Sequence, residues 1–412
     1  MRATTSALLL AGWLAAGAPA AAAPSEASPG GDRCDGGAES VEPSAQVRAC
    51  TAAIEAGRLS GKELSRAYHH RGLAHLGEGD FNAAIKGFNE AIRLDHGFVD
   101  AFHKRGLAWL RKTAYDRAIV SLDEAIRLDP HHADAFGARA AAYFGKQQYE
   151  QAIADYTEAS RLDPQRAVLI SDRGDVRYTA KDYARAIADY DAALALDPKL
   201  ARAVVNRGFA RYQLQAYRAA LADFDRAIRL DPGNATAFNG RGLAYFQIKR
   251  YDRAIADFDK AIRLDPKDAS AHNNRGSAYR AKGDLGRAIA DFSEAIRLDP
   301  KFAAAFYNRG TALGAKGHVD RGIADCSVAI KLDPSQADAF LNRGLAYHDR
   351  KQFDRAIADF NEAIRLDPDN AEAWRSRGIT YRAMGERGRA KADFSRAIKL
   401  APRSRSVAGP AN

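Results

Sequence analysis

A period of 34 residues governs the sequence from residue 63 to residue 402. Prolines recur at this interval without a single insertion, and His96 occupies the same position one period before the first of them. A chain that repeats at this length folds as stacked supersecondary units rather than around one central core. The marker prolines are Pro130, Pro164, Pro198, Pro232, Pro266, Pro300, Pro334, Pro368 and Pro402. The sequence therefore predicts ten tandem units in strict register.

Each unit carries two amphipathic helical patterns. In residues 233–266, the first pattern runs through Phe238, Gly242 and Tyr245, and the second runs from Tyr251 to Ile262. Apolar residues spaced by three and four positions lie on one face of a helix. The sequence Leu-Asp-Pro then ends the second pattern, because the residue before a proline is disfavoured in the α region. Each unit is therefore predicted to be a helical hairpin.

The period, the aromatic-x-x-x-Gly-x-x-Tyr element, the Ala-x-x-x-Phe element and the closing proline resemble the tetratricopeptide repeat (TPR) family over residues 63–402. The resemblance implies an all-α fold, a right-handed superhelical solenoid of helical hairpins. It also implies a non-catalytic scaffold that binds a peptide or helix of another protein in a concave groove, which the first helix of each unit lines. The alternative is a structural protein that self-associates into oligomers through the array ends or the convex face.

One departure from the family pattern is systematic. The family usually has Leu before the glycine of the first helix, whereas this chain has Arg in all ten units. We interpret these arginines as structural, each pairing with the Asp of Leu-Asp-Pro or with a second repeated acid such as Asp257. A cationic rail for a polyanion is the alternative interpretation. The ten residues are Arg71, Arg105, Arg139, Arg173, Arg207, Arg241, Arg275, Arg309, Arg343 and Arg377.

The segments outside the repeats indicate export. Residues 1–22 combine a basic start, a short apolar run and small residues, which is typical of a signal peptide. Residues 23–44 are rich in Pro, Gly and Ser and are predicted to be a flexible linker, whereas 45–62 match a second helix and are expected to cap the array. Residues 403–412 are predicted to be a disordered tail. We expect an exported protein, periplasmic or secreted, without stable membrane insertion.

The three cysteines agree with an oxidising compartment. Cys34 and Cys50 are close enough in sequence to form a disulfide. Cys326 stands at the position that the aromatic Phe258 occupies in the unit of residues 233–266. We predict a Cys34–Cys50 disulfide and a buried free thiol at Cys326. The alternative for Cys50 is a small buried residue without a partner.

No catalytic or cofactor motif stands out, and the sequence predicts neither an enzyme nor a cofactor. There is no phosphate-binding glycine loop, no HExxH and no CxxC. His69 and His103 lie one period apart and could share a metal ion, but without a third ligand we expect packing or exposed histidines and no metal site. The net charge of +10 suits an acidic protein partner, and no recognised nucleic-acid fold or continuous basic run supports nucleic-acid binding.

The predicted groove follows the residue four positions after each glycine, which we call the groove row. Its members change from apolar and aromatic to polar after the sixth unit. Asparagines two positions before the glycine are expected to hydrogen-bond an extended backbone, while aromatic anchors often dominate binding energy. The alternative is that these aromatics only pad neighbouring helices. The predicted groove residues are Phe144, Tyr178, Tyr212, Phe246, Arg280 and Arg382 in the row, with Asn206, Asn274, Asn308 and Asn342 beside it.

Overall fold

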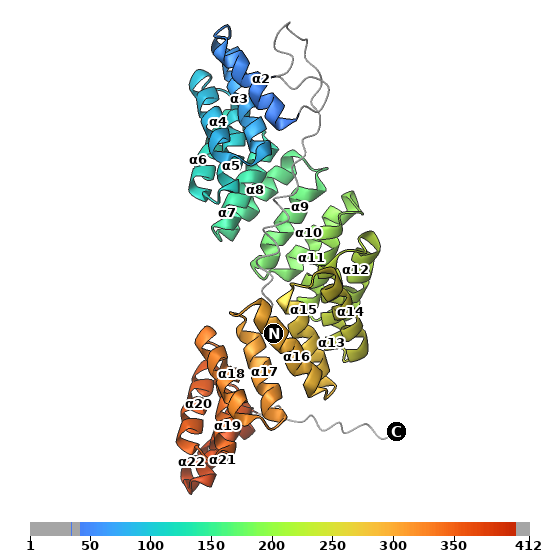
Figure 1. The fold of residues 1–412 in the computed structure, drawn as a ribbon, viewed down its shortest axis with the longest axis vertical. Helices are drawn as coiled ribbons and strands as arrows, with labels where there is room; N and C mark the ends of the chain where they lie inside the picture. The colour runs from blue at the N-terminus through green and yellow to red at the C-terminus, as the bar shows by residue number, and fades with distance from the viewer. Residues whose placement is uncertain (1–33, 35–41, 401–412) are drawn as a thin grey trace, which may run out of the picture. The chain divides into compact units, whose positions relative to one another are not determined.

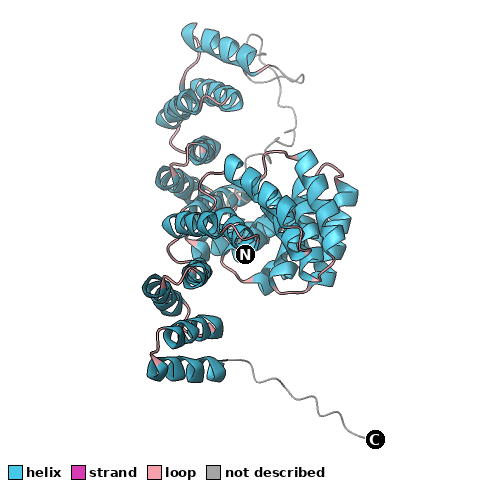
Figure 2. Ribbon diagram, turned by 60° about the horizontal axis from the view of Figure 1, so that its bottom comes forward, coloured by secondary structure: helices cyan, strands magenta, loops and turns pink. Residues whose placement is uncertain are grey.

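The computed structural model describes Cys34 and residues 42–400. The predicted signal peptide, nearly all of the predicted linker and the predicted C-terminal tail lie outside these residues. The described residues form 21 α-helices and no strand, which confirms the predicted all-α class (Figures 1 and 2). The helices fall into two compact parts, divided between Leu230 and Asp231. Each part is a stack of helical hairpins.

The N-terminal part begins with a single helix that packs against the first hairpin. Five hairpins follow, from α3 to α12. Each first helix packs against its own second helix and against the helix that precedes it. The helices are α2 (Pro43–Glu55), α3 (Gly61–Glu78), α4 (Phe81–Leu94), α5 (Val99–Arg111), α6 (Tyr115–Leu128), α7 (Ala133–Gly145), α8 (Tyr149–Leu162), α9 (Ala167–Thr179), α10 (Tyr183–Leu196), α11 (Ala201–Gln213) and α12 (Tyr217–Leu230).

The C-terminal part contains the hairpins of the last five units, stacked in the same way. Its helices are α13 (Ala235–Gln247), α14 (Tyr251–Leu264), α15 (Ala269–Ala281), α16 (Leu285–Leu298), α17 (Ala303–Ala315), α18 (Val319–Leu332), α19 (Ala337–Asp349), α20 (Phe353–Leu366), α21 (Ala371–Ala383) and α22 (Arg387–Leu400).

The core of each hairpin is a close approach between its two helices. A Cβ atom built on Gly242 would lie 2.6 Å from Cε1 of Phe258, whose side chain is fully buried. Gly106 faces Leu122 and Gly174 faces Tyr190 in the same way. Because the large side chain of the second helix occupies the space that a Cβ would need, these three hairpins require glycine. The third unit instead has Ala140 at this position, in one core with Tyr156.

The repeated arginines are structural, and from the third unit onward their main partner is an Asp on the second helix of their own hairpin. The first two units have Gly87 and Ser121 at this position, and Nε of Arg105 donates to the hydroxyl of Ser121 at 3.1 Å. Both Nε and Nη2 of Arg275 bond the carboxylate of Asp291, at 2.8 and 2.6 Å. On its other side, Nη1 of Arg275 donates to Asp259 of the preceding hairpin at 2.6 Å. The same pairing over 16 residues joins Arg139 to Asp155, Arg173 to Asp189, Arg207 to Asp223, Arg241 to Asp257, Arg309 to Asp325, Arg343 to Asp359 and Arg377 to Asp393.

The Asp of the Leu-Asp-Pro closure has a different role from the one predicted for it. Oδ1 of Asp299 accepts the backbone N–H of Lys301 at 2.9 Å, and Asp265 caps Lys267 in the same manner at 3.0 Å. A carboxylate that bonds the backbone two residues later stabilises a turn. The closure Asp therefore shapes the loop between hairpins, while the Asp within the second helix pairs with the arginine.

The first helix of the array, α2, is attached to the segment before it. Cys34 and Cys50 form a disulfide in the structure, with Cα atoms 4.6 Å apart, a separation that suits such a bond. Both cysteines pack with Ala67 of α3, and Nε2 of Gln46 donates to the carbonyl of Cys34 at 3.2 Å. This arrangement is compatible with the predicted pairing. Cys326 is a free, buried cysteine, as expected.

Candidate binding groove along the first helices

The predicted groove residues all lie on first helices, and they are divided between the two parts of the fold. Phe144, Tyr178 and Tyr212 stand on α7, α9 and α11 of the N-terminal part, whereas Phe246 and Arg280 stand on α13 and α15 of the C-terminal part. In the C-terminal part, successive first helices contact one another from α13 to α21, whereas in the N-terminal part α3 contacts α5, α5 contacts α7 and α9 contacts α11. The first helices of the C-terminal part therefore form a continuous surface.

The aromatic residues of the row pack inside their own hairpins. Each ring meets the aromatic residue that begins the following second helix: the centroids are 5.4 Å apart for Tyr178 and Tyr183 and 5.5 Å apart for Phe246 and Tyr251. Tyr178 is 7% exposed, while Phe144, Tyr212 and Phe246 are half-buried. These contacts agree with the alternative of intramolecular padding, and they leave part of three rings accessible.

The asparagines beside the row join neighbouring hairpins. The Nδ2 group of Asn274 donates to Oδ1 of Asn239 at 3.0 Å, and that of Asn308 donates to Asn273 at 2.9 Å. Asn342 donates to the hydroxyl of Tyr307 at 2.9 Å. Each of these amide nitrogens thus makes a hydrogen bond between hairpins, which accounts for one of its two N–H donors in Asn274 and Asn308.

Asn206 also joins two neighbouring hairpins, through a hydrogen-bond network that contains the charged residues Asp175 and Arg202. Its Nδ2 donates to Oδ1 of Asp175 at 2.7 Å, and the hydroxyl of Tyr190 donates to the same oxygen at 2.7 Å. Arg202 contacts the other oxygen of Asp175 at 3.0 Å. Burial raises the pKa of Asp175, and the bonds from Arg202, Tyr190 and Asn206 oppose this effect. This network stabilises the contact between α9 and α11.

The arginines of the row differ in exposure. Arg280 is half-buried, whereas Arg382 is exposed, with its guanidinium 5.7 Å from the ring centroid of Phe394.

A small cavity opens among α17, α18 and α19. It encloses about 170 Å³, and three unusually small residues make room for it: Gly314 in the groove row, Gly322, and Cys326 in the position of an aromatic. The lining also includes Thr311 and Asn342, with Gly310, Ala315, Val319, Leu345, Ala346 and Asp349 completing it. The repeat pattern did not predict this site, although Gly314 interrupts the groove row.

Five other hairpins place a ring pair at the two corresponding positions. Tyr212 packs on Tyr217 and His348 packs on Phe353, whereas the eighth unit has Gly314 and Val319 in these two positions. A Cβ built on Gly314 meets no atom within 4 Å. In the eighth unit, the cavity therefore lies where these five hairpins have a ring in the groove row.

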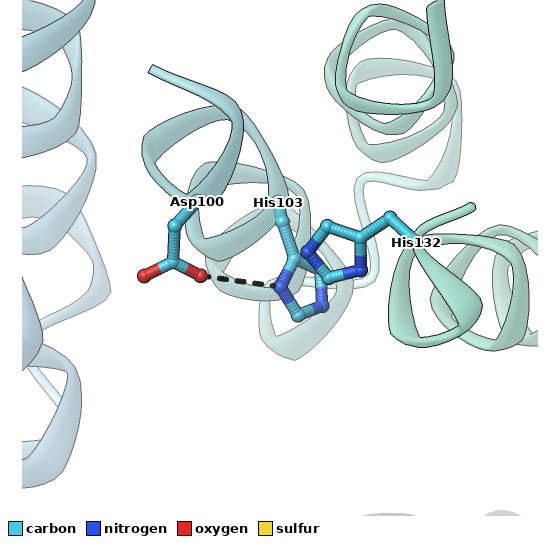
Figure 3. A group of neighbouring side chains, drawn as sticks. All are labelled: Asp100, His103 and His132. Atoms are coloured by element: carbon cyan, nitrogen blue, oxygen red, sulfur yellow. Dashed lines mark ion pairs between the residues drawn. The ribbon is translucent and has the colours of Figure 1, made fainter. Parts of the chain in front are cut away.

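A group of histidines lies at the start of α5 and α7 (Figure 3). Asp100 and His103 stand on α5, and His132 immediately precedes α7; one ligand atom from each lies within 4.8 Å of the others. Nε2 of His69, on α3, is 3.0 Å from Oδ2 of Asp100. The one-period spacing of His69 and His103 suggested that they would face each other directly, but they do not. Instead, both face Asp100.

The protonation states in this group follow from burial and charge. Burial lowers the pKa of His103, and the neighbouring Lys104 adds to this effect. Burial alone would raise the pKa of Asp100, but the His103 and His69 imidazoles and the Lys104 ammonium lower it well below its usual range. At neutral pH the group therefore contains a carboxylate and a neutral buried imidazole.

None of the described helices is long and apolar enough to cross a lipid bilayer. The sequence matches the profile of the tetratricopeptide repeat at residues 70–133, 115–167, 205–269, 239–303, 273–337, 337–370 and 371–404, and that of the TPR repeat at 174–215. No curated protein sequence matches this chain.

Two solved structures of similar architecture support the fold. The crystal structure of the APC/C hetero-tetramer Cut9-Hcn1 is 15% identical, with 88% of this chain and 80% of that chain covered and a TM-score of 0.53. A tetratricopeptide repeat protein from Parabacteroides merdae is 20% identical, with 60% of this chain and 98% of that chain covered and a TM-score of 0.52. At these identities the similarity concerns the fold.

Proposed function

We propose that this chain, which belongs to the tetratricopeptide repeat family, is a non-catalytic scaffold that binds a peptide or helix of a partner protein along its first helices. Protein–protein interaction is the general role of TPR arrays. The finer proposal, a bound segment in the groove, rests chiefly on one observation: the cavity among α17, α18 and α19.

The cavity suits one large apolar side chain of the partner. Its volume of about 170 Å³ is similar to that of a protein cavity that binds benzene, roughly 150 Å³. Equivalent positions of other hairpins hold rings, such as Tyr212 and Phe246, so the surrounding backbone is already shaped for one. We infer that a Phe, Tyr or Leu of the partner enters beside Gly314, with Asn342 at the rim.

The groove residues of the C-terminal part would then contact the flanking parts of the segment. Arg280 precedes the cavity by one unit and Arg382 follows it by two, and they favour acidic residues in the partner. The half-buried edges of Phe144, Tyr212 and Phe246 offer apolar contact elsewhere. Asn206, Asn274, Asn308 and Asn342 would act mainly by holding neighbouring first helices in register, because their amide groups bond between hairpins.

Selection of binders from a random peptide library on the immobilised full chain tests this proposal. We expect enriched peptides to share one large apolar residue. Gly314→Phe should fill the cavity and weaken their binding more than about tenfold, or about 1.4 kcal/mol, without lowering the melting temperature.

Gly388→Phe is the matched control, because a Cβ at Gly388 on α22 also meets no atom within 4 Å. This variant should bind the peptides as the wild type does. Failure to enrich any peptide would contradict the groove function, and equal binding to Gly314→Phe would contradict the cavity as the anchor.

Self-association remains a second candidate because of the last helix. Ile398 on α22 is 75% exposed, whereas the equivalent Ile364 is 8% exposed and packs in a core with Ala373 of the following helix. An uncovered apolar position at the end of a stack can join two chains. Light scattering over a wide concentration range distinguishes the candidates, since Ile398→Glu should abolish any oligomer that uses this end.

We further propose that the protein works in an oxidising compartment, the periplasm or the extracellular space. The Cys34–Cys50 pairing supports this proposal. Titration of thiols in the denatured full chain should find one thiol without reductant and three after reduction. Three thiols before reduction, in protein isolated from its native compartment, would contradict it.

A further inference from the structure

The histidine group at α5 draws its members from three successive units. His69 belongs to the first unit, Asp100 and His103 belong to the second, and His132 belongs to the third. Figure 3 shows the carboxylate of Asp100 and the ring of His132 on two sides of the His103 ring. The rings of His103 and His132 meet edge to face, with centroids 4.8 Å apart. Three potential ligand atoms therefore converge between two first helices.

Two nitrogens of this group lack hydrogen bonds. Nε2 of His69 and Nδ1 of His103 are buried, and neither has a hydrogen-bond partner in suitable geometry. Both approach Asp100: Nε2 of His69 lies 3.0 Å from Oδ2, and Nδ1 of His103 lies 3.6 Å from Oδ1. The two side chains are only 4% and 3% exposed. A buried polar atom without a hydrogen bond is unfavourable, and a bound ion would relieve this cost at His103.

We propose that Asp100, His103 and His132 bind a divalent transition-metal ion such as Zn²⁺, which links the second and third units. Two imidazoles and one carboxylate are ligands that Zn²⁺ uses in proteins, and a water molecule completes a tetrahedral set. Nitrogen-rich ligands of this kind also accept Ni²⁺ and Co²⁺. The site would be independent of the groove and of the partner's identity.

The geometry requires a modest closure. Ligands about 2.0–2.2 Å from a Zn²⁺ ion lie closer to one another than the 4.8 Å limit found here, so side-chain rotation of the half-buried Asp100 and His132 must bring them inward. Nζ of Lys104 lies 3.8 Å from Oδ1 of Asp100, and this ion pair would be lost when the ion binds.

His132 also changes its hydrogen bond. Its Nδ1 accepts the backbone N–H of Ala135 at 3.3 Å and caps α7. Ligation through Nε2 places the proton on Nδ1, so this long bond is given up when the ion binds. His69 then orients the carboxylate, because its Nε2 faces Oδ2 while Oδ1 faces His103.

Calorimetric titration of the untagged, chelator-treated full chain with ZnCl₂ tests the site. We expect one ion per chain and a melting temperature that rises with Zn²⁺. Titration with CoCl₂ should add the visible absorption of a tetrahedral ion. His132→Ala and Asp100→Asn, which change half-buried residues, should each weaken Zn²⁺ binding more than about tenfold and abolish the Co²⁺ absorption.

His131→Ala is the matched control, because His131 is exposed and lies next to His132 in the same loop. It should leave both Zn²⁺ affinity and Co²⁺ absorption unchanged. A second check is Lys104→Ala, which removes the competing cation and should tighten binding. Absence of binding, or binding that survives in both His132→Ala and Asp100→Asn, would overturn the proposal.

Discussion

The arginine before each first-helix glycine shows how one residue can join three helices. In the ninth unit, Nε and Nη2 of Arg343 bond Asp359 at 2.8 and 2.7 Å, while Nη1 donates to Ser327 of the preceding hairpin at 3.0 Å. The planar guanidinium has donors on both sides, which an ammonium lacks. The pattern therefore suits arginine and excludes lysine as an equivalent.

Removal of the carboxylate should destabilise the protein more than removal of the pair. The Arg343 side chain is 19% exposed and that of Asp359 is 8% exposed, so Asp359→Ala leaves a largely buried cation without its main partner. We expect a loss of about 2–4 kcal/mol in unfolding free energy. The double variant Arg343→Leu/Asp359→Ala should recover most of this loss. Denaturant unfolding measures both, and equal stability of the single and double variants would contradict the expectation.

Acid should weaken the equivalent ion pair between Arg275 and Asp291. Burial alone would raise the pKa of this carboxyl group, but the bonds from Arg275 and His272 outweigh burial, so the pKa is lowered. A lowered pKa in the folded state gives stability that is complete above the unfolded pKa of about 3.9 and is lost as the pH falls toward the folded pKa.

The measurable quantity is the difference in unfolding free energy between the wild type and Asp291→Asn. It should be constant from neutral pH to about pH 5 and should shrink below about pH 4. A difference that grows in acid would show that the pKa is raised instead.

At the scale of elements, most hairpins depend on the contact between the repeated glycine of the first helix and a large side chain of the second. Gly242 is one of these repeated glycines, whereas Gly314 stands in the groove row, four residues after the repeated Gly310. Gly242 faces Phe258 at close range, while Gly314 faces open space at the cavity. Glycine in a helix is intrinsically unfavourable. At Gly242 the close packing against Phe258 requires it, whereas at Gly314 it leaves room for a ligand.

The same substitution should therefore have opposite effects at these positions. Gly242→Ala introduces a methyl group 2.6 Å from a fully buried ring and should cost about 1–3 kcal/mol. Gly314→Ala meets no atom and should gain about 0.5–1 kcal/mol from helix propensity. Thermal melts of the two variants provide the comparison. A stable Gly242→Ala would show that the helices can separate without cost.

At the scale of the whole molecule, stability is a sum over neighbouring hairpins rather than a property of one core. Residues 165–215 depart most from the repeat pattern, since Arg177 and Arg211 replace the usual tyrosines. In the structure, these arginines bond Asp189 and Asp223 at 2.7 and 2.8 Å. Buried ion pairs contribute little net stability, because desolvation offsets their attraction.

We therefore expect this segment to open first. Native-state hydrogen exchange should show faster exchange in residues 165–215 than in 235–300, where rings such as Phe258 and Phe292 fill the core. Unfolding of the full chain should also be less cooperative than that of a globular domain of equal length. If residues 165–215 were the best protected segment, the assignment of the weak point would be wrong.

The amino-acid sequence by itself determined the hairpins and their order, because helical periodicity, the glycine position and the closing proline act within one unit. It also predicted that the arginines are structural, since a packed cation requires acceptors. Two acidic positions per unit were available, however, and only the helix-to-helix contact selects Asp291 over Asp299 as the partner of Arg275.

The tertiary structure decided the contacts between units. Asn274 bonds Asn239, 35 residues away, because stacking sets the offset between first helices, and no motif within one unit encodes that offset. For the same reason, the approach of His132 to Asp100 and His103 could not be predicted from the one-period spacing of His69 and His103. The cavity likewise depends on Gly314 and Cys326, whose positions become one empty space only when two helices pack together.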